Sequence, residues 1–323
     1  MSEIMRPMSF AQIMTWALRE YNRHGRIFGV RKEKFYVNTS GTRMSIFGAA
    51  LGSPVGPAAG PNSQLAPNII AAYLTGSRFM ELKTVQKIDG EELRKCVPRP
   101  CINAQDEGYN VEWSTELTIP EAFEEYAKAW IAIHALAKVA GVANERDFAF
   151  NMSVGYDLEG IRSPKIDNYI ESMKNAADTP VWKESIAWLR DNIGDIPNVE
   201  LADIDAISPR ISDSVTLSTL HGCPPEQIEL MAKHLLQEKK VHAFVKCNPT
   251  LLGYEKARAL LDGMGYDYVA FGEHHFKNDL QYADAIGMLG RLMEYAAERN
   301  RAFGVKITNT FPVKITRDRK SVV

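Results

Sequence analysis

The chain has 323 residues, of which 45% are hydrophobic and 24% are charged. Its net charge of −2 gives no strongly basic face, which argues against a nucleic-acid partner. No run approaches the ~18 apolar residues of a membrane span, and no apolar signal-peptide core follows the first residues. Four cysteines in so long a chain make no disulfide framework, so we expect a cytoplasmic protein with reduced thiols and no membrane partner.

The first predicted element is a helix over residues 9–24, because its apolar residues recur at intervals of three and four. These residues are Phe10, Ile13, Met14, Ala17, Leu18 and Tyr21. Gly25 follows the last of them and favours the end of the helix. We assign residues 1–46 to an N-terminal helical extension and residues 47–323 to the main domain.

From residue 52 onward, short apolar runs that end in small or polar residues alternate with amphipathic stretches. The runs cover residues 52–60, 79–85, 147–154, 214–219, 243–248, 266–271 and 303–310, and the clearest helical stretches cover 120–140, the residues after Pro224, and 279–299. Strands that alternate with helices predict parallel pairing with right-handed crossovers, in a barrel or a doubly wound sheet. The stretch 161–213 is too long for one barrel unit, and we interpret it as a helical insertion.

The segment 53–61 and the segment 79–85 hold the first two candidate sites. Small residues after a strand, in Gly56-Pro57-Ala58-Ala59-Gly60-Pro61, let a flat ring approach the backbone, although a Gly/Pro turn has the same composition. Glu81-Leu82-Lys83-Thr84 puts a cation and a hydroxyl at a strand's carboxyl end, which is the catalytic face of α/β barrels. A solvated strand terminus is the alternative.

Asn151 and Cys223 are the next candidates along the chain. Asn151 interrupts a buried-looking strand, so its amide needs partners, either a ligand or the backbone. Cys223 comes just before a predicted helix, whose dipole favours a thiolate, and His221 nearby can lower the thiol pKa further. An inert buried cysteine is the alternative.

Lys83, Lys246 and Lys306 each lie at the end of a different predicted strand. Together they predict a positive lining that suits an anionic ring or a phosphate. Sequence motifs for other kinds of site are weak, because the sequence has no dinucleotide-binding fingerprint and no phosphate-binding loop. The single pair Cys96 and Cys101 does not make a metal site, and we read Glu273-His274-His275 as a solvated loop, so no metal is expected.

Taken together, the motifs resemble the FMN barrel of dihydroorotate and dihydropyrimidine dehydrogenases, in the same order over residues 46–310. The nearest resemblance is to the N-terminal domain of the YgfK-type selenate reductase family. The stretches that carry it are Gly56–Pro61, Glu81–Gln86, Phe150–Tyr156, Leu220–Pro225 and Lys246–Tyr254. The resemblance implies an α/β fold, a (β/α)8 TIM barrel of the dihydroorotate dehydrogenase type, and FMN as the cofactor.

The resemblance also implies a role for each candidate residue. Ala58, Ala59 and Gly60 would lie against the isoalloxazine ring, Lys83 and Thr84 would contact the flavin, Asn151 would bond its pyrimidine edge, and Lys246 would sit near N1 and O2. Cys223 matches the family's general acid/base, and Asn309 and Thr310 match the pair that faces the substrate ring. The family's Asn three residues before the catalytic Cys has no clean equivalent, since Thr219, Leu220, His221 and Gly222 precede Cys223.

The resemblance further leads us to expect an incomplete barrel. The family holds the flavin phosphate with glycine-rich turns after the seventh and eighth strands, whereas the 13 residues after Thr310 contain no glycine. We therefore expect a chain whose last two strands are missing. FAD and iron–sulfur centres, which belong to fuller family members, would then be carried by partner subunits.

Three hypotheses for function follow. The first is a flavin-dependent oxidoreductase domain that acts on a small-molecule substrate and is incomplete as given. The second is a non-catalytic assembly or docking fragment of a multi-subunit redox enzyme. The third is a Schiff-base lyase that uses Lys83 or Lys246 on a barrel strand.

Overall fold

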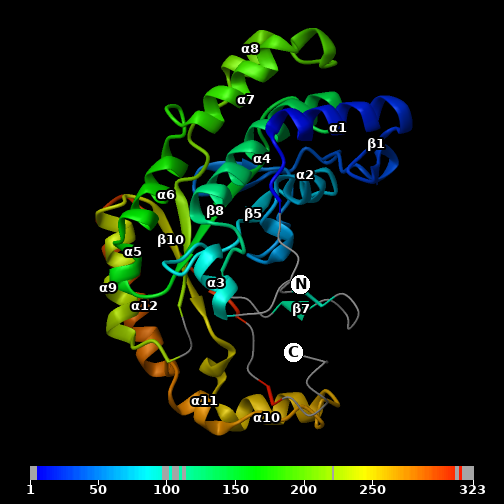
Figure 1. Cartoon of the computed structure of the whole chain (residues 1–323). Helices are drawn as coiled ribbons and strands as arrows, with labels where there is room; N and C mark the ends of the chain where they lie inside the picture. The colour runs from blue at the N-terminus through cyan, green and yellow to red at the C-terminus, as the bar shows by residue number, and fades with distance from the viewer. Residues whose placement is uncertain are drawn as a thin grey trace.

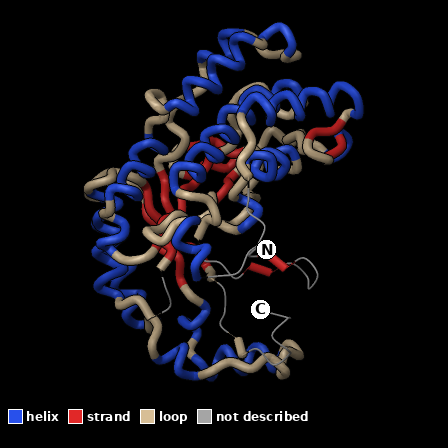
Figure 2. The backbone as a smooth tube through the Cα atoms, viewed as in Figure 1, coloured by secondary structure: helices blue, strands red, loops and turns tan. Residues whose placement is uncertain are grey.

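The computed structural model describes residues 6–96, 102–103, 109–110, 114–219, 222–309 and 313–314. Within these ranges, five parallel strands form the main sheet, in the order β11-β10-β9-β8-β5, and helices cover its outer face (Figures 1 and 2). The fold is therefore α/β, and the parallel strands are joined through helices, as predicted for the barrel units.

The strands are β1 (Arg26–Ile27), β2 (Val30–Arg31), β3 (Met44–Ile46), β4 (Ala49–Leu51), β5 (Phe79–Glu81), β6 (Ile102–Asn103), β7 (Tyr109–Asn110), β8 (Ala149–Gly155), β9 (Ser214–Ser218), β10 (His242–Cys247) and β11 (Phe303–Ile307). The helices are α1 (Phe10–His24), α2 (Ala66–Leu74), α3 (Gly90–Cys96), α4 (Ile119–Val139), α5 (Leu158–Ile161), α6 (Pro164–Lys174), α7 (Pro180–Asp191), α8 (Leu201–Asp205), α9 (Pro225–Gln237), α10 (Tyr254–Gly263), α11 (Glu273–Lys277) and α12 (Tyr282–Ala297). The stretch predicted as a helical insertion thus folds into α6, α7 and α8, after the short α5.

The sheet curls so that its two edges face each other, which makes it a half-barrel. Lys306 of β11 forms an ion pair with Glu81 of β5, although β8, β9 and β10 lie between these strands in the sheet. The rings of Phe79 and Phe244 also meet across the interior, with their centroids 6.2 Å apart. A flat sheet would hold these pairs more than 10 Å apart, because neighbouring strands are spaced by about 4.8 Å.

The two faces of the sheet differ in chemistry because side chains alternate along each strand. Apolar side chains of β8, β9 and β10 point outward and are buried under the helices: Phe150, Met152, Val154, Val215, Leu217, Ala243 and Val245. The side chains between them, which include Asn151, Ser153, Thr216 and Lys246, point into the interior. The polar face of the sheet is therefore the concave one.

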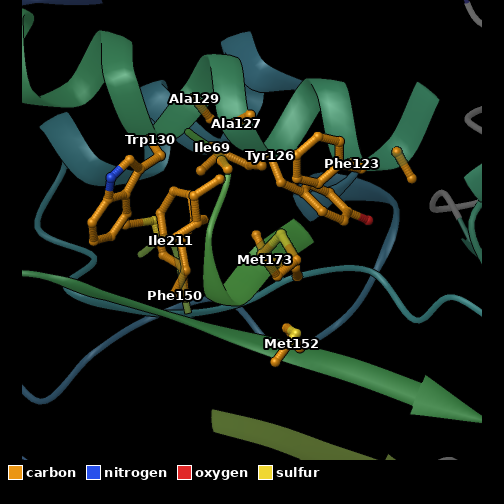
Figure 3. Packing of buried hydrophobic residues seen from close by; sticks show 14 of the residues in the cluster. Ile69, Phe123, Tyr126, Ala127, Ala129, Trp130, Phe150, Met152, Met173 and Ile211 are labelled. Atoms are coloured by element: carbon orange, nitrogen blue, oxygen red, sulfur yellow. The ribbon is translucent and has the colours of Figure 1, made fainter. Parts of the chain in front are cut away.

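Helix α4 is the centre of the helical layer. Its first turn is fixed by a capping box between Thr118 and Glu121, with a proline at the start of the helix. Figure 3 shows Trp130 and Tyr126 of α4 directed toward Phe150, Ile211 and Met173. The predicted helix over residues 120–140 is confirmed, and its burial on nearly every side marks it as a core helix rather than a surface one.

Helix α1 belongs to the same layer. Gly25, in the left-handed conformation, ends the helix as predicted. The ring of Phe10 meets Trp188 of α7 edge-on at 5.8 Å, and the Lys128 ammonium of α4 donates to the Met8 carbonyl at 2.7 Å. The N-terminal helix and the α6–α8 segment therefore pack around α4 together (Figure 1).

The hairpin β3–β4 lies at the amino ends of the strands. At its turn, Phe47 stacks on His242 at 4.8 Å and contacts Phe244 at 4.9 Å. A cavity of about 540 Å³ opens beside the hairpin, between Phe47, Trp130 and Arg210. This cavity is at the opposite end of the strands from the predicted catalytic face, so we do not assign the chemistry to it.

Two predictions for the region between β10 and α12 are wrong. Residues 266–271 were predicted as a strand but form turns. Arg258 donates hydrogen bonds to the carbonyls of Tyr266 and Val269, so these carbonyls are not available to pair with a neighbouring strand. The ring of Tyr268 is mostly exposed, which also removes the reason for a buried strand. The Glu273-His274-His275 segment, predicted as a loop, lies in the short helix α11.

The outer side of β11 is poorly covered. The side chains of Val305 and Ile307 are 39% and 83% exposed, and Tyr282, Ile286 and Met293 form an exposed stripe on α12. Apolar surface of this extent is typical of a contact face. Across the described ranges, the helices include none with the length and hydropathy to span a bilayer.

Candidate active site

Four charged side chains from three strands meet inside the curled sheet, and we call Glu81, Lys83, Lys246 and Lys306 the strand-end cluster. Lys246 and Lys306 are register partners on the neighbouring strands β10 and β11. Lys306 contacts the Glu81 carboxylate, and the charges of Glu81, Lys83 and Lys306 all act on Lys246. The positive lining predicted from Lys83, Lys246 and Lys306 therefore exists as a single group.

Burial has a clear effect on Lys246. Burial, together with the neighbouring ammonium groups of Lys306 and Lys83, lowers the pKa of its ammonium to about 8, although Glu81 acts in the opposite direction. Its Nζ lies 3.4 Å from the Ser218 hydroxyl. The cluster thus brings three ammonium groups and one carboxylate together inside the sheet.

Glu81 has unused hydrogen-bonding capacity. One carboxylate oxygen accepts from the backbone N–H of Ala59 at 2.8 Å and contacts Lys306. The other oxygen, Oε1, is buried and has no hydrogen-bond partner among the described residues. A buried acceptor in this state is an expected point of contact for a ligand donor.

The small residues of the first motif lie beside this cluster. The carbonyls of Val55 and Pro57 accept from the N–H groups of Phe79 and Glu81 at 3.3 and 3.1 Å, so this segment runs along β5 like a further parallel strand. Gly56 is required there, since a Cβ atom would lie 1.5 Å from the Phe79 carbonyl oxygen. Ala58, Ala59 and Gly60 follow directly, beside Glu81 and partly open to solvent.

Asn151 and Thr84 make their bonds within the protein. The Asn151 amide donates to Thr216 and accepts from Ser214, each at 2.7 Å, and the residue is fully buried. The Thr84 and Ser153 hydroxyls are also 2.7 Å apart. These bonds fit the structural alternative for Asn151, and the flavin contacts of both residues stay predictions.

Cys223 lies in the loop between β9 and α9 and is partly buried. Burial, followed by the carboxylates of Asp279 and Asp157, raises the pKa of its thiol to about 11. The pKa shift is therefore upward rather than the expected lowering, with burial as its largest cause and the two carboxylates adding to it. His221 and Thr310 lie outside the described residues.

Asp279, which the sequence did not suggest, organises this loop layer. Its buried carboxylate accepts from the Gly222 N–H at 3.2 Å and from the Asn248 amide at 2.8 Å. Asn248 in turn accepts from the Asn309 amide at 2.9 Å. The candidate site thus has two parts, the strand-end cluster inside the sheet and a loop layer with Cys223 and Asn309 beyond the strand ends.

The described residues offer no ready metal site, because they bring no three His, Cys, Asp or Glu side chains into a metal-binding group. The chemistry available at the described site is that of ammonium groups, a carboxylate, amides and a protonated thiol. Such a set suits the binding of an anionic ring and the movement of a proton.

Comparison with known proteins shows which family this chain belongs to. Residues 28–321 match the family model described as the N-terminal TIM-barrel domain of the oxidoreductase YgfK. The chain is 44% identical over 326 residues to "Putative oxidoreductase YgfK" of Escherichia coli strain K12, an alignment that covers 96% of this chain and 31% of that protein. The protein of the same name from Escherichia coli O157:H7 matches equally. The chain therefore spans about a third of the length of these relatives.

Proposed function

The chain belongs to the family of YgfK N-terminal TIM-barrel domains, and from this premise we propose that it is the FMN-binding part of an oxidoreductase of the dihydroorotate dehydrogenase type. FMN, when bound, would accept or give a hydride at N5. The substrate would be a small unsaturated molecule, and electrons would be exchanged with protein segments or partner subunits that carry FAD or iron–sulfur centres.

The observation that carries the proposal is the strand-end cluster. The pyrimidine edge of a flavin gains negative charge on reduction, and Lys246 and Lys306 supply two adjacent cations from neighbouring strands. The unpartnered Glu81 oxygen is an acceptor of the kind that a ring N–H needs. The small side chains of Ala58, Ala59 and Gly60 leave the ring room to approach, so the residues fit the cofactor.

Each part of the site then has its own task. The cations would hold the negative edge of the ring, and the segment 58–60 would support its face. The Cys223 thiol stays protonated at neutral pH because its pKa is about 11, so it holds a proton at Sγ that can be donated to a substrate carbon. Asn309, with Thr310, would orient the substrate ring.

Flavin titration tests the proposal. Fluorescence quenching with FMN and with riboflavin measures binding of the phosphate-bearing ligand and of the ring portion separately. Lys246→Met should weaken both by at least about tenfold, because it removes a desolvated cation from the ring edge. The control is Lys256→Met, an exposed lysine on α10, which should change neither. Equal affinities in both variants, or no flavin binding by the full-length protein, would contradict the proposal.

A second candidate function rests on a different observation. The exposed side chains of Val305 and Ile307 on β11, together with the stripe on α12, favour a docking role in a multi-subunit redox enzyme. In that case the chain would co-purify with an FAD- or iron–sulfur-containing partner while holding no flavin of its own. Ile307→Lys should then abolish co-purification and leave flavin titration unchanged.

A further inference from the structure

Asp279 joins three loops through one carboxylate. Oδ1 accepts from the N–H groups of Gly222 and Leu280, at 3.2 and 3.0 Å. Oδ2 accepts from the Asn248 amide at 2.8 Å and from the Thr250 hydroxyl at 2.7 Å. The loop after β9, the loop after β10 and the segment before α12 therefore meet at one buried anion.

A continuous chain of hydrogen bonds runs through this anion. The Asn309 amide, at the end of β11, donates to Asn248, the Asn248 amide donates to Asp279, and the Gly222 N–H donates to the other oxygen of Asp279. Cys223 is the next residue after Gly222. Gly222 has a φ of +83°, a conformation that strains other residues, so glycine is favoured at the position beside Cys223.

The charge of Asp279 also acts on the thiol. Among the described residues, the charged groups that act on Cys223 are Asp279 and Asp157, and both carboxylates raise its pKa beyond the effect of burial. Asp157 has a separate structural task, because its side chain caps α5 by accepting from the Gly160 N–H. Of these two carboxylates, Asp279 is the one that, within the described residues, also bonds the backbone beside Cys223.

We propose that Asp279 is a positioning residue that fixes the Cys223 loop relative to Asn309. This inference rests on the proposed function in treating Cys223 as the proton donor and Asn309 as a substrate contact. A single buried anion would then set the distance between these two groups, and its charge would add to the effect of burial in opposing ionisation of the thiol.

Two measurements on flavin-free protein test the proposal. The pH dependence of Cys223 alkylation by iodoacetamide, followed by peptide mass spectrometry, reports the thiol pKa. Hydrogen exchange of the peptide around Gly222 reports how firmly the loop is held. In Asp279→Asn, the alkylation midpoint should fall by on the order of one pH unit and loop exchange should rise about tenfold.

Matched variants separate charge from position. Asp157→Asn removes the other carboxylate and keeps a good helix cap, so it should lower the alkylation midpoint without changing loop exchange. Thr250→Val keeps both charges and removes one bond to Oδ2, so it should raise loop exchange with an unchanged midpoint. If Thr250→Val alters neither measurement, or if Asp279→Asn behaves like Asp157→Asn, the positioning role is wrong.

A folded Asp279→Asn protein with an unchanged alkylation midpoint would overturn the electrostatic part. Circular dichroism establishes that the variant is folded, and if Asp279→Asn fails to fold, the Asp157→Asn and Thr250→Val arms decide alone. Neither measurement involves flavin, so loss of flavin binding would count against the proposed function and leave this result standing.

Discussion

Lys306 of β11 forms an ion pair with Glu81 of β5 across the interior of a sheet in which three strands separate them. Their side chains are only 21% and 7% exposed, so the pair is largely withdrawn from solvent. The contact joins two strands that are not neighbours in the backbone ladder of the sheet. This ion pair is therefore direct evidence of the curvature of the sheet. It also lies where the proposed ligand would bind.

A double-mutant cycle on Glu81→Gln and Lys306→Met measures this contact. Each single change leaves a partly buried charge without its partner, so we expect a coupling energy of about 1–3 kcal/mol in urea unfolding. The control cycle is Lys87→Met with Glu159→Gln, an exposed pair at 3.5 Å, for which we expect less than about 1 kcal/mol. Similar coupling in the two cycles would show that the sheet is less curled in solution.

The reactivity of Lys246 should depend on its neighbours. Its pKa of about 8 predicts acylation by acetic anhydride at lower pH than for exposed lysines, as measured by competitive labelling and mass spectrometry. Lys306→Met removes a nearby cation, so the pKa of Lys246 should rise and its labelling at pH 8 should slow. Unchanged labelling in that variant would mean that the two ammonium groups do not interact.

The same property of Lys246 allows a test of the Schiff-base alternative. An amine that is half neutral near pH 8 can condense with a carbonyl compound. Treatment with borohydride in the presence of candidate carbonyl substrates should leave no adduct on Lys246 if the flavin hypothesis holds. A substrate-dependent adduct on this residue, absent from Lys246→Met, would favour the lyase.

Gly56→Ala should be strongly destabilising. The added Cβ atom would lie 1.5 Å from the Phe79 carbonyl oxygen, so the segment 55–57 would have to leave β5, at a cost of at least about 3 kcal/mol. Gly194→Ala is the matched control, because nothing lies within 4 Å of its added Cβ. Thermal unfolding should separate the two variants by more than 5 °C, and equal melting temperatures would disprove the close packing.

His134 predicts a pH dependence of stability. It lies on α4 and packs against Trp130 and Phe148, and burial, with a smaller effect of Arg146, lowers its pKa to about 4. The unfolded chain binds a proton near pH 6.5 and the folded chain does not, so stability is lost as the pH falls from 6.5 toward 4. The loss should reach about 2–3 kcal/mol in this window.

The variant His134→Phe should remove this part of the pH dependence. Urea unfolding at pH 8 and pH 5 measures the difference directly. Phenylalanine keeps an aromatic ring against Trp130 and also removes the buried Nε2, which has no partner among the described residues. If the variant and the original chain lose the same stability between these pH values, other groups are responsible.

Local sequence signals predicted several of the helices. The period of apolar residues placed α4 within one residue of its observed bounds. The apolar run 266–271 looked like a strand because composition alone does not reveal that Arg258 occupies its carbonyls. Short apolar runs are where periodicity is least informative.

The candidate site was predictable only in part. Lys83, Lys246 and Lys306 were found because each ends a predicted strand, and parallel strand ends meet at one edge of a sheet. Asp279 was missed because Gly222, one of its partners, lies 57 positions away in the sequence. The direction of the pKa shift at Cys223 was also not predicted, because it is set first by burial in the fold and then by carboxylates on distant loops.

The contact between Phe10 and Trp188 ties the first helix of the chain to the α6–α8 segment. The N-terminal helix and the α6–α8 segment look like independent additions to a barrel, but they pack together around α4 as one structural unit. If one of them is shortened, replaced by the equivalent segment of a relative or deleted, the aromatic side chain of the other becomes exposed to solvent.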